Sequence, residues 1–217
     1  MKKLLALVVV VFAFAAPSAF AKNDYSCDKK FIFFPGGPEG GPFGTIVYNG
    51  AVAAAEHTGC HVDYYWSQWN SEIMIKQFKE AVALQPDGIA IYGFPGDEAM
   101  RPIIKEAREM GIVITTMNTP LPDLEAEYKT TGFGYAGADL FDAGYNLGKK
   151  GVEVCGLSSG DKAFVWGLAS MPNRGERTKG AIKALEDLGV KVVYQEIPDN
   201  VNSDASQGTP MYVATYS

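Results

Sequence analysis

Residues 85–115 read QPDGIAIYGFPGDEAMRPIIKEAREMGIVIT. The Pro86-Asp87-Gly88 turn leads into a short apolar run from Ile89 to Tyr92, and a second apolar run covers Ile112 to Thr115. Between them lies a helical pattern that we expect Asp97 to cap. Short, wholly apolar runs are typical of strands that helices cover on both faces. The stretch therefore predicts a strand, a helix and a parallel neighbouring strand, joined by a right-handed crossover.

The same alternation continues on both sides of this stretch. Asn70 can cap the preceding helix, whose apolar residues recur at helical spacing. Alternating strands and helices predict an α/β fold with parallel sheets flanked by helices. A second series of elements begins near Ala138, which predicts a second lobe. The remaining elements are expected as strands at residues 31–34, 61–65, 131–135, 163–167 and 190–196, and as helices at 46–57, 139–150 and 173–188.

The first 21 residues have the pattern of a cleaved export signal. Lys2 and Lys3 precede an apolar run from Leu4 to Ala16, and Ala19-Phe20-Ala21 is a small-x-small cleavage site. The apolar run is too short to span a bilayer, and no cysteine stands directly after the cleavage site to receive a lipid. We therefore predict cleavage after Ala21, no direct membrane insertion, and a mature protein free in the periplasm.

Charge and cysteine content narrow the class further. The chain has a formal net charge of −6, which makes nucleic acid and anionic membranes poor partners. Cys27 and Cys60 each precede a predicted strand, and these two strands should be neighbours in the sheet. We hypothesise that the two cysteines form a disulfide in an oxidising compartment. Cys155 has no partner in this scheme and is expected to be a buried or idle thiol.

Two glycine motifs imitate nucleotide-binding or catalytic loops. Residues 36–41 read GGPEGG after the first strand, but the spacing fits neither phosphate-binding fingerprint, and Glu39 would repel a phosphate. Residues 156–160 read GLSSG, the letters of a nucleophile elbow, yet they precede a strand instead of following one. The only histidines, His57 and His61, stand far upstream, and no metal-binding set surrounds them. No cofactor, metal ion or catalytic residue is therefore predicted.

Aromatic side chains gather where the predicted strands end. In open parallel sheets, ligands bind at the carboxyl ends of the strands. Aromatic rings stack on the apolar faces of sugars, and planar Asn, Asp and Arg groups bond the neighbouring hydroxyls. This edge of the sheet therefore favours a polar small-molecule ligand. The aromatic residues concerned are Phe43, Tyr64, Tyr65, Trp66, Trp69 and Phe94.

Several short motifs occur in a characteristic order along the chain. They are GPF at 41–43, QPDGI at 85–89, MGIVIT at 110–115, YAGAD at 135–139 and ERTKG at 176–180. In this order the chain resembles the periplasmic sugar-binding proteins of the ribose/galactose type, the type I periplasmic binding proteins that supply ABC transporters. The resemblance covers essentially the whole chain after residue 21, and the order of the motifs makes it specific.

The resemblance implies two similar lobes joined by a hinge, with a sugar enclosed between them. Residues 22–137 would form the N-terminal lobe, and 138–217 an incomplete C-terminal lobe, because the unit that begins at Asp204 does not return to the sheet. The implied function is capture of a monosaccharide or related polyol and its delivery to an inner-membrane ABC permease. Two alternatives stay open: a receptor module that senses a sugar or autoinducer by the same closure and, less favoured, an exported hydrolase.

The resemblance also implies particular ligand-binding residues. It places Phe43 against the sugar ring and Asn118 where relatives commonly use an aspartate to bind hydroxyls. Asp139 stands where the chain crosses between the lobes, and Arg177 lies in an Arg-x-x-Gly pattern, with Arg174 as a nearby alternative. Because Asn118 departs from the usual acid, the identity of the sugar stays open.

Overall fold

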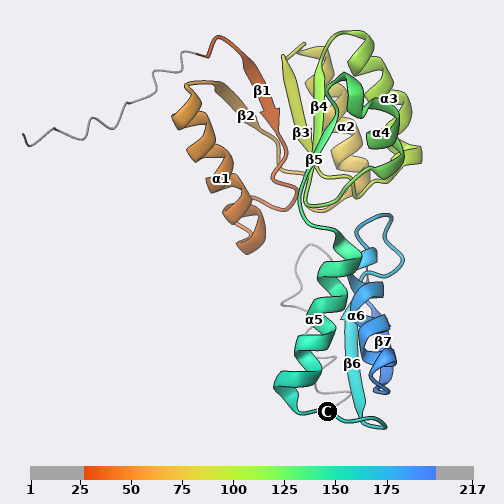
Figure 1. The fold of residues 1–217 in the computed structure, drawn as a ribbon. Helices are drawn as coiled ribbons and strands as arrows, with labels where there is room; N and C mark the ends of the chain where they lie inside the picture. The colour runs from red at the N-terminus through yellow and green to blue at the C-terminus, as the bar shows by residue number, and fades with distance from the viewer. Residues whose placement is uncertain (1–26, 199–217) are drawn as a thin grey trace, which may run out of the picture.

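The computed structural model describes residues 27–198 and contains two separate parallel sheets (Figure 1). One sheet has five strands in the order β2-β1-β3-β4-β5, and the other pairs β6 with β7. The prediction of an α/β fold with parallel sheets flanked by helices is confirmed. The strands are β1 (Lys30–Phe33), β2 (His61–Tyr64), β3 (Gly88–Ile91), β4 (Val113–Met117), β5 (Gly134–Ala136), β6 (Lys162–Gly167) and β7 (Lys191–Glu196).

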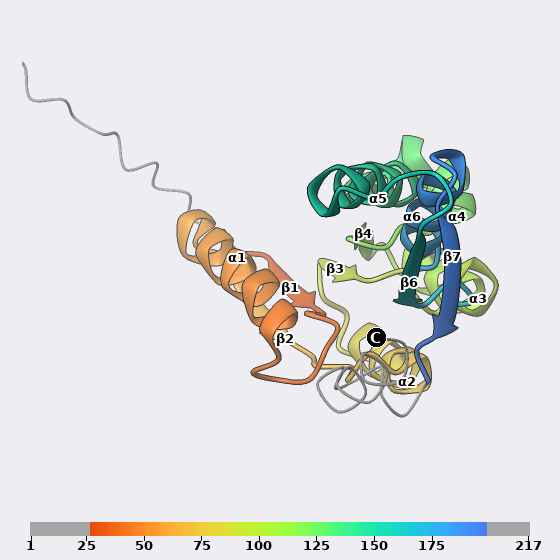
Figure 2. The same cartoon turned by 90° about the horizontal axis from the view of Figure 1, so that it is seen from below.

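Right-handed crossovers distribute the helices of the larger sheet over both of its faces. Helix α1 (Pro42–Thr58) connects β1 to β2 on one face, whereas α2 (Ser71–Ala83) and α3 (Asp97–Glu109) return the chain on the other (Figure 2). The short α4 (Pro122–Tyr128) follows β4 and lies against α3. A single 3-10 turn, η1 (Lys129–Thr131), then leads to β5.

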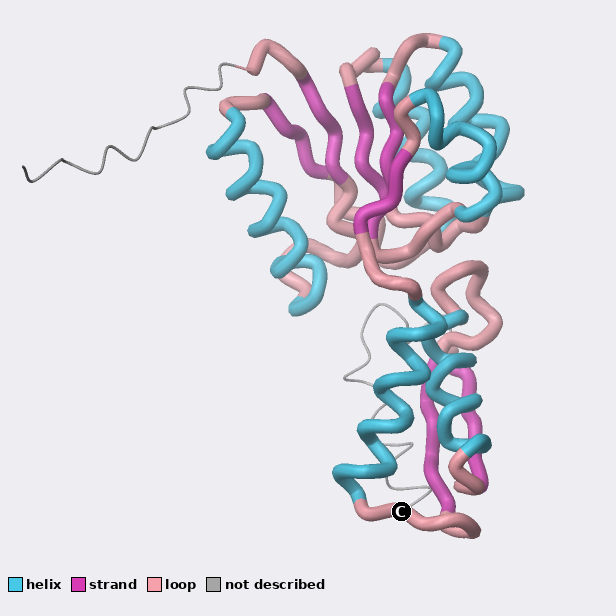
Figure 3. The backbone as a smooth tube through the Cα atoms, viewed as in Figure 1, coloured by secondary structure: helices cyan, strands magenta, loops and turns pink. Residues whose placement is uncertain are grey.

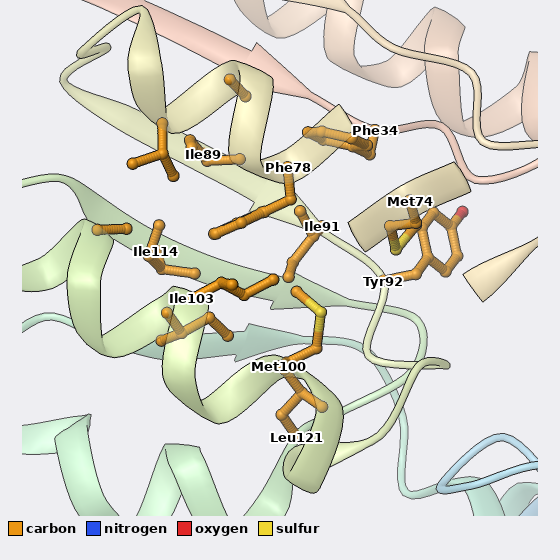
Figure 4. Packing of buried hydrophobic residues seen from close by; sticks show 14 of the residues in the cluster. Phe34, Met74, Phe78, Ile89, Ile91, Tyr92, Met100, Ile103, Ile114 and Leu121 are labelled. Carbon is orange, nitrogen blue, oxygen red and sulfur yellow. The ribbon is translucent and has the colours of Figure 1, made fainter. Parts of the chain in front are cut away.

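The main core of this N-terminal unit, β1 to β5 with α1 to α4, lies between the sheet and helices α2 and α3. Ile91 and Ile114 from the sheet meet Phe78 and Met100 from the helices, and all four side chains are fully buried (Figure 4). In α1, by contrast, only Gly44 is buried. An apolar cavity of about 350 Å³ separates α1 from the strands beneath it. The two faces of the sheet are therefore unequally packed.

The C-terminal unit contains α5 (Leu140–Cys155), β6, α6 (Glu176–Asp187) and β7. A short loop after β5 leads directly into α5, so a single chain crossing joins the two units within residues 27–198 (Figure 3). Helices α5 and α6 approach each other closely through glycines. A Cβ atom on Gly144 would lie 1.9 Å from the carbonyl oxygen of Arg177, which only glycine avoids. This close contact sets where Arg177 stands relative to the crossing.

Some elements begin at residues other than those predicted. Helix α1 begins at Pro42 instead of residue 46, because proline has a preset φ that suits the first turn and its missing N–H would be unpaired there anyway. Phe43 therefore lies on a helix and not in a loop. Helix α6 begins at Glu176, which leaves Asn173 in the preceding loop with φ 54°. Strand β5 begins only at Gly134, after η1.

Of the two predicted helix caps, one is confirmed and one is wrong. Asn70 caps α2 and accepts a hydrogen bond from the backbone N–H of Ile73 at 2.9 Å. The residue that precedes α3 is Gly96, so Asp97 lies inside the first turn. The Asp97 carboxylate instead accepts from two backbone N–H groups in the first turn of α4, each at 3.0 Å. Helix α4 was not predicted, and Asp97 therefore stabilises an element that lies far along the chain.

The hypothesised disulfide is present. Cys27 and Cys60 are bonded, with their Cα atoms 4.6 Å apart, and the bond joins the segments that enter β1 and β2. Cys155 is a free thiol at the end of α5 and is exposed, so of the two expected alternatives, a buried thiol and an idle one, burial is excluded. The export segment at 1–21 and the unit expected from Asp204 lie outside the described residues.

Candidate ligand-binding site

The carboxyl ends of the five parallel strands all lie at one edge, which faces the C-terminal unit (Figure 1). The loops at this edge follow β1, β2, β3 and β4. From the other side, the loop between β6 and α6 reaches them, since Met171 packs against the core of the N-terminal unit. This edge is therefore where both units contribute side chains.

Trp69, in the loop after β2, is seated on the glycine motif that follows β1. The backbone N–H of Trp69 donates to the carbonyl of Gly36 at 2.9 Å, and that of Gln68 donates to the carbonyl of Gly37 at 3.2 Å. A Cβ atom on Gly36 would lie 2.5 Å from the indole ring, and one on Gly37 would lie 2.8 Å from it. The glycines thus make room for the indole, which explains the motif without a bound phosphate.

Trp69 is the centre of an aromatic cluster that we call the Trp69 group. Its ring centroid lies 6.0 Å from that of Phe43, 5.5 Å from that of Tyr92 and 6.2 Å from that of Phe94. Tyr92 and Phe94 are buried, whereas Phe43 is 41% exposed. Phe43 therefore presents an exposed ring at this edge, while Phe94 belongs to the core.

Three other aromatic residues, Tyr48, Tyr64 and Trp66, form a separate cluster, the Trp66 group. Tyr48 of α1 lies 5.5 Å from Trp66 and 4.6 Å from Tyr64, measured between ring centroids. These side chains line a cavity of about 550 Å³ together with the carboxylates of Glu39 and Asp63. Within residues 27–198, no ring or charge contact links this group to the C-terminal unit. Tyr65 belongs to neither group and packs on Phe34, 5.5 Å away.

Arg174 brings the C-terminal unit onto the Trp69 group. Its guanidinium carbon lies 5.0 Å from the centroid of the Trp69 ring, which is a cation–π contact. Burial and the nearby charge of Arg177 lower the pKa of Arg174 from its ordinary value, although arginine stays charged at neutral pH. No carboxylate of the described chain forms an ion pair with either arginine, so this part of the site is positively charged.

Two buried hydroxyl groups at this edge have no hydrogen-bond partner within residues 27–198. Tyr92 is fully buried and stands at the margin of the core cluster (Figure 4), and its hydroxyl has no hydrogen-bond partner in residues 27–198. Burial raises the pKa of Tyr92 to about 12, so the hydroxyl is neutral and able to donate. The Thr119 hydroxyl is also buried without a partner in the same range. Buried polar groups are normally paired, so both hydroxyls are candidates to bind a ligand.

Asn118 lies in a strained turn after β4. Its φ of 58° is in the left-handed region, which asparagine tolerates better than most residues. The backbone N–H of Asn118 donates to the carbonyl of Ala136 at 3.0 Å, and the hydroxyl of Tyr135 lies 3.0 Å from the carbonyl of Asn118. The backbone is thus tied to β5, while the side-chain amide makes no hydrogen bond to the described residues.

Asp139 stands at the crossing between the units but lies apart from Trp69. Its carboxylate caps α5 by accepting from the backbone N–H of Asp142 at 2.9 Å. Asp139 and Asn173 both line a cavity of about 480 Å³ beside the crossing. Asn173 also donates to the free carboxylate oxygen of Asp97 at 3.1 Å. This last bond joins the two units directly.

The structure brings only some of the predicted site residues together. Phe43 and Arg174 meet at Trp69, and Arg177 is close enough to Arg174 to affect its charge. Asn118 and Asp139 lie nearer the crossing. Trp69 was predicted only as one of several aromatic residues at this edge. Four further candidate residues carried no signal for a site in the sequence: Tyr92, Thr119, Asp97 and Asn173.

Three other features were considered in the described residues: a metal site, a catalytic serine and a membrane-spanning helix. Residues 27–198 contain no group of three or more His, Cys, Asp or Glu side chains able to hold a metal ion. The GLSSG motif follows the end of α5 and leads into β6, so it is not on a strand-to-helix turn. No helix of the described range has the length and apolar character needed to cross a membrane.

Comparison with known proteins identifies the family. A model described as "Periplasmic binding protein domain" matches residues 32–211. The chain belongs to the periplasmic binding protein family. The search of curated proteins found no match to this chain.

Solved structures share the fold of this periplasmic binding protein. The glucose-galactose binding protein GanP from Geobacillus stearothermophilus is 22% identical, with a TM-score of 0.67 over 86% of this chain and 64% of that one. A Burkholderia graminis ABC transporter solute-binding protein in complex with D-arabinose is 22% identical, with a TM-score of 0.70 over 88% and 62% of the two chains. A periplasmic sugar-binding protein from Legionella pneumophila is 21% identical, with a TM-score of 0.69 over 86% and 67%. The chain spans about two thirds or less of the length of these proteins.

Proposed function

We propose that this chain is an exported solute-binding protein that captures a monosaccharide or related polyol and delivers it to an inner-membrane ABC permease. The N-terminal lobe is residues 22–137 and the C-terminal lobe is residues 138–217. The observation that carries the proposal is the contact of Arg174 with Trp69, because it joins a polar group of one unit to an aromatic platform of the other. Family membership and the sugar-binding descriptions of the solved structures support it.

Each candidate side chain is assigned a contact with the sugar that fits its chemistry and its surroundings. Phe43 and Trp69 present ring faces to the apolar face of a sugar. Arg174 and Arg177 donate to hydroxyl or ring oxygens, and the free amide of Asn118 can both donate and accept. Asp139 accepts from a hydroxyl at the crossing while its cap keeps it in place. A wrong ligand would leave these groups unpaired, and this cost provides selectivity.

The protein acts by binding and not by turnover. Membership in the periplasmic binding protein family supports this part of the proposal. We expect the mature chain to leave glycosides and phosphate esters unchanged.

Thermal melting of residues 22–217 with a panel of pentoses, hexoses and polyols tests the binding function. A ligand that binds only the native state must raise the midpoint by mass action. We expect one compound to do so and also to change the tryptophan fluorescence. The fluorescence change should disappear in Trp69→Phe and persist in Trp66→Phe, which serves as the matched control. A panel with no active compound would contradict the proposal.

A further inference from the structure

The charge balance at the Trp69 group is unusual. Arg174 is partly buried, and the five N–H donors of its guanidinium find no acceptor within residues 27–198. Its guanidinium carbon lies over the face of Trp69, 5.0 Å from the ring centroid. Arg177, three residues further along the chain, is a second cation, and its charge lowers the pKa of Arg174. Arg177 makes no ion pair within residues 27–198. Two positive charges therefore face this edge without a described counter-charge.

Three carboxylates in this part of the fold are already engaged elsewhere. Asp97 accepts from two backbone N–H groups of α4 and from the Asn173 amide. Asp139 caps α5, and Glu176 pairs with Lys179 at 2.6 Å. Each of these groups has a structural partner that it would have to give up in order to neutralise Arg174. The counter-charge for Arg174 is thus not supplied by them.

Burial makes this arrangement costly without an acceptor. A guanidinium removed from water needs hydrogen-bond acceptors, and its best match is a planar carboxylate that takes two parallel N–H bonds. The cation–π contact offsets only part of that cost. The Tyr92 hydroxyl lies close enough to Arg174 to affect its charge, and it remains a neutral donor that is buried without a described partner. Donors therefore outnumber acceptors at this point of the site.

We infer that the site takes an acidic monosaccharide, a uronic or aldonic acid, in preference to its neutral parent. The sugar carboxylate accepts two hydrogen bonds from Arg174 beside the Trp69 ring and one from the Tyr92 hydroxyl, and Arg177 adds to the positive potential. The inference rests on the proposed function and specifies the class of its ligand. The ligand carboxylate would thus provide the hydrogen-bond acceptors for Arg174 that residues 27–198 do not provide.

Calorimetric titration of residues 22–217 with matched pairs tests the inference. The pairs are D-galactose with D-galacturonate, D-glucose with D-glucuronate, and D-glucitol with D-gluconate. We expect at least one acid to bind ten times more tightly than its neutral partner. Arg174→Gln should remove this preference. Arg101→Gln, which removes an arginine of α3 that pairs with Glu127 of α4, should leave it unchanged.

The outcomes separate the inference from the proposed function. If a neutral sugar binds as tightly as its acid or more tightly, the inference is overturned and the proposed function stands. If no member of any pair binds, both are overturned. If Arg174→Gln does not fold, Arg174→Lys keeps the charge but loses the two-bond geometry, and an undiminished acid preference in that variant would show that Arg174 does not bind the carboxylate as described.

Discussion

The Trp69 group and the Trp66 group come from almost the same stretch of sequence, yet the structure gives them different surroundings. Both contain aromatic rings of comparable size, and both stand where β1 and β2 end. The Trp69 group receives Arg174 from the C-terminal unit, whereas the Trp66 group lies against α1 beside the carboxylates of Glu39 and Asp63. Aromatic content therefore does not distinguish the two groups. They differ in the residues that contact them from other parts of the fold.

The largest expected difference between the groups comes from Trp69→Ala. It removes the ring that holds Phe43, Tyr92 and Arg174, and we expect ligand binding to become undetectable. Because the ring also fills the space over Gly36, unfolding stability should fall by about 3 kcal/mol. Urea denaturation and calorimetry measure the two effects. The matched control, Trp66→Ala, should lose stability but keep its affinity, and loss of affinity in both variants would remove the distinction.

Asp97→Ala tests how the C-terminal unit is held beside the Trp69 group. The change deletes bonds to the first turn of α4 and to Asn173, and hydrogen bonds to a charged group contribute roughly 2 kcal/mol. We expect a stability loss of that size in urea denaturation. Asn173→Ala should reproduce only a smaller part of it. Equal losses in the two variants would mean that the contact between the units, and not α4, carries the effect.

Phe43→Ala affects the exposed part of the Trp69 group. Since the side chain is 41% exposed, the melting temperature without ligand should change little, while affinity should fall about tenfold through lost stacking. Tyr48→Ala is the matched control, because Tyr48 stands on the same helix and belongs to the Trp66 group. A large destabilisation with intact affinity would show that Phe43 is a core residue.

Tyr92→Phe should have the smallest effect. The lost hydroxyl is buried without a partner in residues 27–198, so its removal should leave unfolding stability unchanged or raise it by up to about 1 kcal/mol at pH 7. Affinity should fall a few-fold if the hydroxyl binds ligand. The same variant should also lessen the loss of stability between pH 10 and pH 12. Burial raises the pKa of Tyr92 to about 12, and the unfolded chain ionises first, which disfavours folding as pH rises.

Local pattern explains why much of the fold could be predicted. Alternating apolar runs and helical spacing predicted most strands and helices, and parallel neighbours placed Cys27 beside Cys60. The errors occurred at element ends and at the short helix α4, which was not predicted. Asp97 has the composition of a cap, but its carboxylate is used by α4, whose pairing depends on residues more than twenty positions away. Such a pairing leaves no local signal.

The sequence by itself determined the alternation of strands and helices, the edge at which the candidate site residues gather, and a family resemblance that the comparison confirmed. It could do so because side-chain spacing and turn residues act over a few positions. The tertiary structure alone decided that Trp69 and not Trp66 meets Arg174, and that Tyr92 is buried without a described partner. Those facts depend on how strands from different parts of the chain align and on which loop of the C-terminal unit reaches them, and contacts of that range are set by packing.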